Sequence, residues 1–446
     1  MTRTEGPRLL RCAPIAIGLL LSGCLAPGAG PGRAGPPSGG APDPPAADQI
    51  PSHPSMVRLA LPRVHVRHGA FLLPDGTPFQ WRGVTAFALA EQVAHGREAE
   101  ARRFLAWAHE TGFTTVRVLA MASGLFRLEP EAGVRALPRV LELAAADSLA
   151  VEIVALADTA SYPGLDLDAH VAAVGHAVAP FAHAVVELAN EPYHPSQRRG
   201  LDAAGRLEEL RARVPAGIAV AFGAHQSDES AAYGAGDFLT VHLSRAPRTW
   251  QQVARVADLS VLARRTGKPV VNDEPIGAGE RLEPGRRWAA PDPFFALGAM
   301  NRLFELGGTF HCDDCLWSRV PGPHQRAAAR AFVAGLRVVP DGLRLDPWAG
   351  TGPVAAFETS RVSSVHAAGS GARSWVVGLG VSGEPGISWR RDWREVRVVA
   401  RRTGVWVWEV ERVPEGDRVC DLGARSRPAA PESSIPAGRS HDISER

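Results

Sequence analysis

The sequence predicts a closed barrel of eight parallel strands, each followed by a helix, with a small β domain after it. Short apolar runs alternate with amphipathic stretches from residue 79 to about residue 316, which is the pattern of a parallel sheet covered by helices. Seven of these steps span about 230 residues, or about 33 residues a step, which suits one unit of a (β/α)8 barrel. A doubly wound open sheet is the alternative fold. Residues 81–85, however, lack the glycine-rich phosphate turn that such a sheet carries after its first strand.

The predicted strands are short runs rich in Val, Ile, Leu, Phe and Thr. They are residues 79–87, 114–119, 151–156, 185–188, 218–222, 238–241, 269–272 and 309–316. Between the third and fourth runs, apolar residues recur at the helical spacing i, i+4, i+7 and i+11, on one face of a helix: Leu167, Val171, Val174 and Val178.

Further elements flank the barrel in the sequence. Residues 69–79 are predicted to form a hairpin that closes the barrel floor, with Asp75-Gly76 as its turn. Beyond residue 340, short strand-like runs at 363–365, 374–379, 396–400 and 405–410 predict the β domain. We interpret the arginines of this region as solvated strand edges rather than a polyanion site: Arg390, Arg391, Arg394, Arg397, Arg401 and Arg402.

The first 24 residues predict a targeting segment. A basic stretch precedes the apolar residues 13–21, which are too few to span a bilayer. Leu21-Ser22-Gly23-Cys24 then resembles the lipobox of bacterial lipoproteins, which implies that Cys24 carries lipid at the mature N-terminus. An ordinary secreted protein is the alternative. We therefore expect an exported protein, held by lipid at the bacterial cell envelope, in the outer membrane if the cell has one.

The predicted organisation has five segments. They are a signal peptide at 1–24, a Pro/Gly/Ala-rich linker at 25–55, the barrel with its hairpin at 56–340, the β domain at 341–422 and a disordered tail at 423–446.

Composition excludes several classes of protein. With 45% hydrophobic and 22% charged residues, the chain is not largely disordered, and 49 basic against 47 acidic residues leave no electrostatic footprint for nucleic acid. The only lysine, Lys268, precedes the seventh run, at the end of the barrel remote from chemistry, which excludes a Schiff-base mechanism. The first run offers no histidine pair for a metal-dependent hydrolase. We expect no metal and no cofactor.

Two glutamates follow predicted strands at the face where such barrels carry their chemistry. Residues 190–192 (Asn-Glu-Pro) follow the fourth run, and residues 273–275 (Asp-Glu-Pro) follow the seventh. If both side chains converge, their oxygens should lie about 5 to 6 Å apart, too close to admit a water between carboxylate and anomeric carbon. Repulsion should then keep one carboxyl protonated near neutral pH. For a glycoside substrate, this spacing would imply cleavage with retention of configuration by Glu191 and Glu274, with Asp273 or Glu280 as alternatives to Glu274.

This arrangement resembles the clan of retaining glycoside hydrolases that contains family 5, the cellulase-like enzymes. In that family the acid/base glutamate follows an asparagine after strand four, and the nucleophile ends strand seven. The resemblance covers about residues 69 to 335. It implies that Glu191 is the acid/base and Glu274 the nucleophile of a double displacement.

Other positions match the family one at a time. Residues 112–117, Gly-Phe-Thr-Thr-Val-Arg, resemble its Gly-Phe-Asn-Thr-Val-Arg, which implies that Arg117 supports the nucleophile. Asn190 would donate to the sugar 2-hydroxyl. His242 matches a histidine near the sugar, and Trp317 matches the tryptophan on which the sugar ring stacks. The alternatives are a surface arginine, a core histidine and a tryptophan of barrel packing.

Two positions depart from the family. Ser244 stands where a tyrosine usually donates to the nucleophile, and Asp158 stands where a histidine often follows strand three. Either the chain resembles a more distant family of the clan, or one of three other residues replaces a missing family side chain: His225, Tyr162 or Tyr193.

Residues 311–315 (His-Cys-Asp-Asp-Cys) have the composition of a metal-ligand cluster. In an oxidising compartment we interpret Cys312 and Cys315 instead as a short-loop disulfide or a pair of free thiols at the barrel rim. Cys420 is then left without a partner.

Together these observations predict a surface-anchored retaining glycoside hydrolase that acts on a β-linked oligo- or polysaccharide. The membrane would be contacted only through the N-terminal lipid. The alternative is a catalytically inactive glycan-binding lipoprotein on the same barrel, for which Ser244 is the best support.

Overall fold

The computed structural model describes residues 61–124, 126–223, 235–243, 249–278, 287–288, 290–348, 354–357 and 361–414. Cys24, the predicted signal peptide and linker, and the predicted tail all lie outside these residues. Within the described part of the chain, no helix combines the length and the apolar character that crossing a membrane requires.

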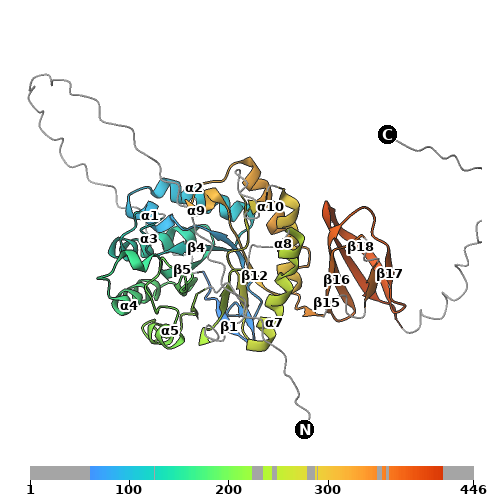
Figure 1. The fold of residues 1–446 in the computed structure, drawn as a ribbon, viewed down its shortest axis with the longest axis horizontal. Coiled ribbons are helices and arrows are strands. Elements are labelled where there is room, and N and C mark those ends of the chain that lie inside the picture. Colours follow the sequence, from blue (N-terminus) through green and yellow to red (C-terminus); the bar gives the residue numbers. More distant parts are fainter. Residues whose placement is uncertain are drawn as a thin grey trace, which may run out of the picture. The chain divides into compact units, whose positions relative to one another are not determined.

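Eight parallel strands form the central sheet (Figure 1). They are β3 (Arg82–Thr85), β4 (Thr115–Leu119), β5 (Ala150–Leu156), β6 (Ala184–Ala189), β7 (Val220–Ala221), β8 (Leu239–Val241), β9 (Val270–Asn272) and β12 (Gly307–Phe310). Each overlaps one of the eight predicted runs. Because β12 pairs with both β9 and β3, the last strand meets the first. The predicted (β/α)8 fold is therefore confirmed.

The two ends of the strand order, β7 and β8, are joined by a side chain as well as by backbone. The Asp237 N–H, two residues before β8, donates to Val220 O of β7 at 2.7 Å. Its carboxylate accepts from the Val220 N–H at 2.9 Å. These two bonds give the end of the sheet partners for its backbone groups, which a buried strand edge requires.

Helices follow most of these strands. They are α1 (Leu89–Ala94), α2 (Glu98–Thr111), α3 (Pro130–Ala146), α4 (Leu167–Val178), α5 (Ala204–Arg211), α6 (Thr249–Ala254), α7 (Val256–Thr266), α8 (Pro291–Leu303), α9 (Asp313–Leu316) and α10 (Pro323–Leu336), with a 3-10 turn at Thr159–Ser161. In α4 the four residues predicted to share a face are all buried, as the spacing requires. A pair of short parallel strands, β10 (Gly277–Ala278) and β11 (Arg287–Trp288), follows β9.

A hairpin closes the amino ends of the barrel strands, as predicted. The turn at Asp75-Gly76 brings Phe79 back to Phe71, whose carbonyl accepts the Phe79 N–H at 2.8 Å. The strand β2 (Ala70–Leu72) also pairs with β1 (His65–Arg67), which the sequence did not predict. The centroid of the Phe71 ring lies 4.8 Å from that of Trp81 and 5.4 Å from that of Phe238. Packed aromatic rings therefore fill the floor of the barrel.

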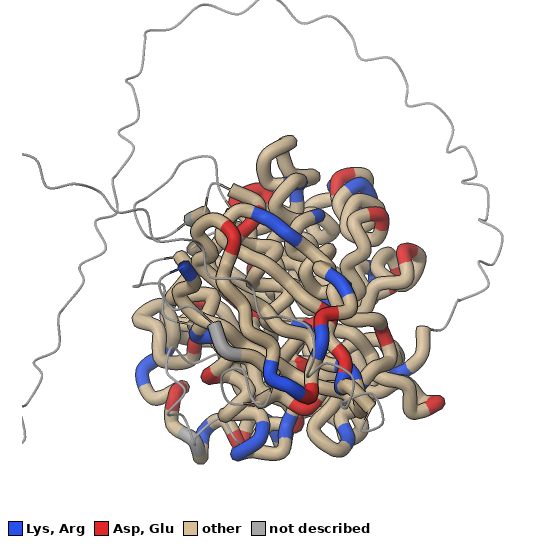
Figure 2. Tube along the Cα trace, turned by 90° about the vertical axis from the view of Figure 1, so that its right-hand side faces the viewer, with Lys and Arg blue, Asp and Glu red and all other residues tan. Residues whose placement is uncertain are grey.

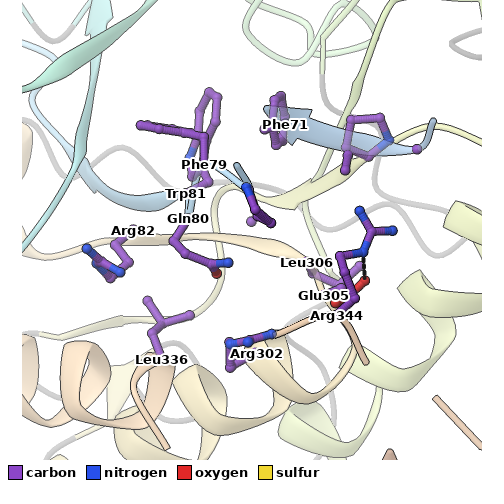
Figure 3. A pocket seen from close by; sticks show the side chains of 15 residues that line it. Phe71, Phe79, Gln80, Trp81, Arg82, Arg302, Glu305, Leu306, Leu336 and Arg344 are labelled. Carbon is purple, nitrogen blue, oxygen red and sulfur yellow. Dashed lines mark ion pairs between the residues drawn. The ribbon is translucent and has the colours of Figure 1, made fainter. Parts of the chain in front are cut away.

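Beside this hairpin the floor holds a cavity of about 50 Å³ (Figure 3). Its polar walls include Arg344 and Glu305, which form the ion pair drawn as a dashed line, with N and O 3.1 Å apart. Arg302 donates to the carbonyls of Pro340 and Leu343 and so ties α8 to the segment after α10. This cavity lies at the end of the barrel opposite the predicted site.

The strands that follow form an antiparallel sheet in the order β13-β15-β16-β19-β18. Their bounds are β13 (Asp346–Pro347), β15 (Ser364–Ser370), β16 (Arg373–Val381), β18 (Trp393–Arg402) and β19 (Gly404–Arg412), and β14 (Ala355–Phe357) pairs separately with β17 (Ile387–Trp389). The four predicted runs lie in β15, β16, β18 and β19. Buried Trp408 belongs to the core of this sheet, whereas buried Trp375 packs in the hydrophobic cluster that continues from the barrel.

Acidic partners accompany the arginines of this sheet. Arg394 pairs with Glu411, and Arg397 donates to Glu409 at 2.8 Å. Arg402 pairs with Asp292 of α8 at 3.2 Å. Blue and red segments are interspersed in Figure 2 rather than gathered in one patch. The pairs of Arg394 and Arg397 agree with the interpretation of solvated strand edges, whereas Arg402 packs on Phe295 of α8.

Candidate active site

The predicted site residues come from several strands of the barrel, whose side chains converge at the carboxyl ends. Arg117 belongs to β4, Asn190 and Glu191 follow β6, His242 follows β8, and Glu274 lies two residues after β9. Arg117 and His242 are buried, and the side chains of Glu191 and Glu274 keep 21% and 11% of their surface exposed. Both glutamates and half-buried Asn190 are therefore within reach of a ligand.

The backbone at Glu191 is unusual. Its φ is +46°, in the left-handed region that costs a residue with a side chain about 1 kcal/mol or more. The segment just after β7 approaches so closely that a Cβ at Gly223 would collide with the Ala189 carbonyl and crowd Pro192. Only glycine permits this approach. Strained backbone held by tight packing fixes the direction in which Glu191 points.

Arg117 is the centre of the cluster. Its Nη1 donates to Glu274 Oε1 at 2.6 Å, and its Nη2 donates to Asn190 Oδ1 at 3.1 Å. Two parallel bonds of 2.9 Å run from Nε and Nη2 to Glu187, and Nε lies 2.6 Å from Asp273 Oδ2. Burial alone would lower the pKa of Arg117, but the surrounding carboxylates raise it well above its usual value. A permanent positive charge therefore stabilises the ionised form of Glu274.

His242 lies between the two glutamates. Its Nδ1 is 2.9 Å from Glu191 Oε1, and its Nε2 is 3.8 Å from Glu274 Oε1. One ligand atom from each of the three residues lies within 4.8 Å of the other two. In retaining glycosidases the two carboxyl groups stand about 5–5.5 Å apart, and in inverting ones about 6.5–9.5 Å.

The pKa of Glu191 is not what repulsion between the two carboxylates alone would predict. Burial raises its pKa, but the hydrogen bond and charge of His242 outweigh burial and leave the pKa below the usual value. For His242, burial lowers the pKa, while Glu274, Asp273 and Glu191 together raise it to about 10. Without a ligand, the proton expected on a carboxyl is therefore held on His242, in hydrogen-bond contact with Glu191.

Tyr193 also holds Glu191. Its hydroxyl donates to Glu191 Oε1 at 2.9 Å. Tyr193 was one candidate to replace the tyrosine that is absent at Ser244. Its hydroxyl contacts the predicted acid/base, Glu191, and not the predicted nucleophile, Glu274. Tyr162 bonds weakly to the Leu128 carbonyl at 3.4 Å. Ser244, His225 and Glu280 lie outside the described residues.

Trp317 is the most exposed aromatic side chain near this face, at 41%. Trp317 directly follows α9, the short helix that comes after β12. Gln92 fixes its backbone by donating to the Trp317 carbonyl at 2.9 Å. Phe126 packs edge-on against its ring at 4.9 Å. A braced, exposed indole is suited to stacking against a sugar ring.

The remaining predicted positions have structural partners. Asp158 accepts the Gly124 N–H at 2.8 Å and so braces the loop after β4. Cys312 and Cys315 form a disulfide, which confirms the first interpretation of that segment. His311 contacts the Thr85 hydroxyl at 3.0 Å.

Arg117 has three further acidic partners, of which Glu152 and Glu187 were not predicted and Asp273 was predicted only as an alternative nucleophile. Glu152 lies in β5, Glu187 in β6 and Asp273 after β9, and all three are fully buried. A signal was present for two of them, because Glu152 and Glu187 interrupt apolar strand runs. A buried carboxylate requires a partner. Nothing in the sequence says which partner it has.

Glu191, His242 and Glu274 are also residue types that bind divalent metals. A metal at His242 would have to displace a firmly held proton and break the bond to Glu191. The residues fit a hydrogen-bonded acid and base better than a resident metal.

Two solved glycoside hydrolases share this fold. A glycoside hydrolase family 5 structure from Bacteroides vulgatus matches with a TM-score of 0.51 and 12% sequence identity, over 79% of this chain and 93% of that chain. Another, described as a glycoside hydrolase, has a TM-score of 0.55 and 12% identity, over 80% of this chain and 98% of that chain. No family model and no curated protein matches the sequence. At these identities the likeness establishes the fold.

Proposed function

We propose that the protein is a retaining glycoside hydrolase that cleaves a β-linked glycan by double displacement. The observation that carries the proposal is the position of His242, which joins Glu191 and brings oxygens of both glutamates within 4.8 Å. With both carboxyls against one sugar at such a separation, no water fits between the carboxylate and the anomeric carbon, which favours direct attack by the carboxylate. The fold shared with glycoside hydrolases supports the same class of reaction.

In the first step, Glu274 is the nucleophile. Arg117 donates to Glu274 Oε1 and keeps the group ionised, and the carboxylate attacks the anomeric carbon. A covalent glycosyl-enzyme ester forms as the glycosidic bond breaks. Glu191 gives a proton to the leaving oxygen.

In the second step, Glu191 accepts a proton from water, which attacks the anomeric carbon and releases Glu274. Two inversions restore the original configuration. The proton that Glu191 needs at the start comes from the pair that it forms with His242, since Nδ1 and Oε1 are 2.9 Å apart. Substrate binding removes water and so favours the neutral pair over the ion pair.

Asn190 and Trp317 would bind the sugar. The Asn190 Oδ1 is occupied by Arg117, so its Nδ2 is the group that would donate to the 2-hydroxyl, a bond that strengthens in the transition state. The exposed Trp317 ring would stack on a sugar face.

Hydrolysis of a panel of β-linked oligosaccharides tests this function. The wild-type chain should release reducing sugar from at least one β-linked class, and Glu274→Gln should lower kcat by about 10⁴-fold while ligand binding persists. Near-wild-type turnover in Glu274→Gln would assign the nucleophile to another residue.

The lowered pKa of Glu191 supports a second candidate, a glycan-binding protein without turnover. It would bind members of the same panel, measured by calorimetry, and release no sugar. In that case Glu274→Gln and wild type would be indistinguishable in both assays.

We also propose that the barrel is anchored to the cell envelope through lipid on Cys24. Cys24→Ser should move the protein from the membrane fraction to the soluble fraction with kcat unchanged, because the linker separates anchor from barrel. A wild-type protein found in the soluble fraction would contradict the anchor.

A further inference from the structure

Beside the proposed catalytic pair, the barrel interior contains more carboxyl groups than its cations can neutralise. Glu152, Glu187 and Asp273 are fully buried, and one oxygen from each lies within 4.8 Å of the other two. With Glu274 they surround a single guanidinium, that of Arg117. Several negative charges in a buried interior are unfavourable unless some are protonated.

Arg117 distributes its donors unevenly among them. Glu187 receives two bonds of 2.9 Å, and Glu274 receives one of 2.6 Å. Asp273 lies 2.6 Å from Nε and also accepts from the Thr309 hydroxyl at 3.0 Å. Glu152 comes no closer to the guanidinium than 3.8 Å. Of the four, Glu152 has the weakest claim to a negative charge.

Buried oxygen atoms that have no hydrogen-bond partner indicate where a proton is needed. Both oxygens of Glu152 are buried and have no hydrogen-bond partner, and the same holds for Asp273 Oδ2, although that atom touches the arginine. All three atoms are acceptors as long as both groups are ionised. One proton on Glu152 turns it into a donor toward Asp273 and gives atoms of both residues a partner.

We propose that Glu152 is a neutral carboxylic acid in the folded protein, that it donates its proton to a hydrogen bond with Asp273, and that this pair positions Arg117 on Glu274. The groups that face Glu152 are Arg117 on β4, Glu187 on β6 and Asp273 after β9. Burial, followed by the charges of Asp273 and Glu187, raises the pKa of Glu152 well above its usual value, and Arg117 only partly opposes this. Electrostatics and hydrogen bonding thus agree.

Neutral Glu152 has a consequence for the proposed reaction, and this consequence rests on the proposed function. An ionised Glu152 would compete with Glu274 for Arg117 from the neighbouring strand. A neutral Glu152 instead ties Asp273 to β5, and Asp273, as an ion-pair partner of Nε, helps to keep the guanidinium in the position from which Nη1 donates to Glu274. Glu152 is a positioning residue that acts through Asp273 and Arg117.

The first test measures protonation without any substrate. The infrared carbonyl band of protonated carboxyl groups, recorded at neutral pH on the full chain, should lose intensity in Glu152→Gln. Glu98→Gln is the matched control, because Arg139 holds the pKa of surface Glu98 below its usual value and its loss should leave this band unchanged. An unchanged band in Glu152→Gln overturns the proposal.

The second test measures how the free energy of unfolding depends on pH. A carboxyl whose pKa is raised by folding stabilises the protein fully below its unfolded pKa, and this contribution is lost as pH rises toward the folded pKa. Glutamine cannot titrate, so the stability of Glu152→Gln relative to wild type should increase from roughly pH 5 to pH 8 in denaturant titrations. A relative stability that is constant or falls over this range contradicts a neutral Glu152.

The third test separates positioning from folding. Glu152→Gln keeps a donor for Asp273, whereas Glu152→Met has similar length and no donor. We expect Glu152→Gln to lose less than about threefold in kcat and Glu152→Met to lose about tenfold or more, with KM unchanged in both. Equal kcat values in two folded variants overturn the positioning role. If neither variant nor wild type turns over any glycan, the proposed function fails, while the infrared and stability results still decide the protonation of Glu152.

Discussion

At the amino ends of its strands the barrel is filled by aromatic rings, and at the carboxyl ends it is filled by charge. The floor consists of Phe71, Trp81 and Phe238, in contact with one another, and its apolar burial favours folding directly. The opposite end holds Arg117 and His242 among buried carboxyls. Groups that lose their hydration there contribute little net stability. The same strands thus carry a plug that stabilises the fold and a cluster that the fold must support.

The largest expected effect on the charged end is on proton transfer. Glu191→Ala should lower kcat by about 10²–10⁴-fold for glycans with poor leaving groups and spare aryl glycosides that need no proton. Added azide should restore turnover and give a β-glycosyl azide, because the alanine leaves room for an anion opposite Glu274. An α-glycosyl azide would exchange the roles of the two glutamates.

The floor should respond in stability alone. Phe71→Ala removes a buried ring and should lower the free energy of unfolding by about 3–5 kcal/mol, measured by denaturant titration, with kcat per folded molecule retained. Val261→Ala is the control, since Val261 is 54% exposed and its loss should change stability by less than about 0.5 kcal/mol. A large loss of kcat in folded Phe71→Ala would show that the two ends are coupled.

A smaller effect is expected at Tyr193. Its hydroxyl helps to lower the pKa of Glu191, so Tyr193→Phe should raise that pKa and let Glu191 keep its proton to higher pH. The basic limb of the kcat/KM profile should therefore move upward, with a loss of kcat of about tenfold or less. Tyr162→Phe, whose hydroxyl bonds to a backbone carbonyl, should leave the profile in place. A downward shift of the limb in Tyr193→Phe would contradict the assignment.

The comparison also explains what the sequence could predict. The strands were predictable because each apolar run is local, and the two glutamates because their positions after strands four and seven follow from counting runs. The network around Arg117 could not be predicted in this way. Arg117 is 70 residues from Glu187 and 157 from Glu274 in the chain, and no local pattern encodes which buried carboxyl pairs with which cation.

The same reason accounts for the error about the proton. From sequence, two close carboxylates should repel and leave one of them protonated. His242 changes this, because it donates to Glu191 from a strand that lies 51 residues further on. The hydrogen bond of Tyr193 to Glu191 was likewise invisible, since it depends on the left-handed backbone at Glu191.

The measurement that tests the central claim most directly is the configuration of the first product. If Glu274 attacks the anomeric carbon and Glu191 supplies and then removes the proton, the first sugar released from a β-linked glycan must be the β anomer. Proton NMR of the early reaction mixture, before mutarotation, should show the β anomer in excess of its equilibrium share. An initial excess of the α anomer would mean a single inversion by water and would contradict Glu274 as the nucleophile.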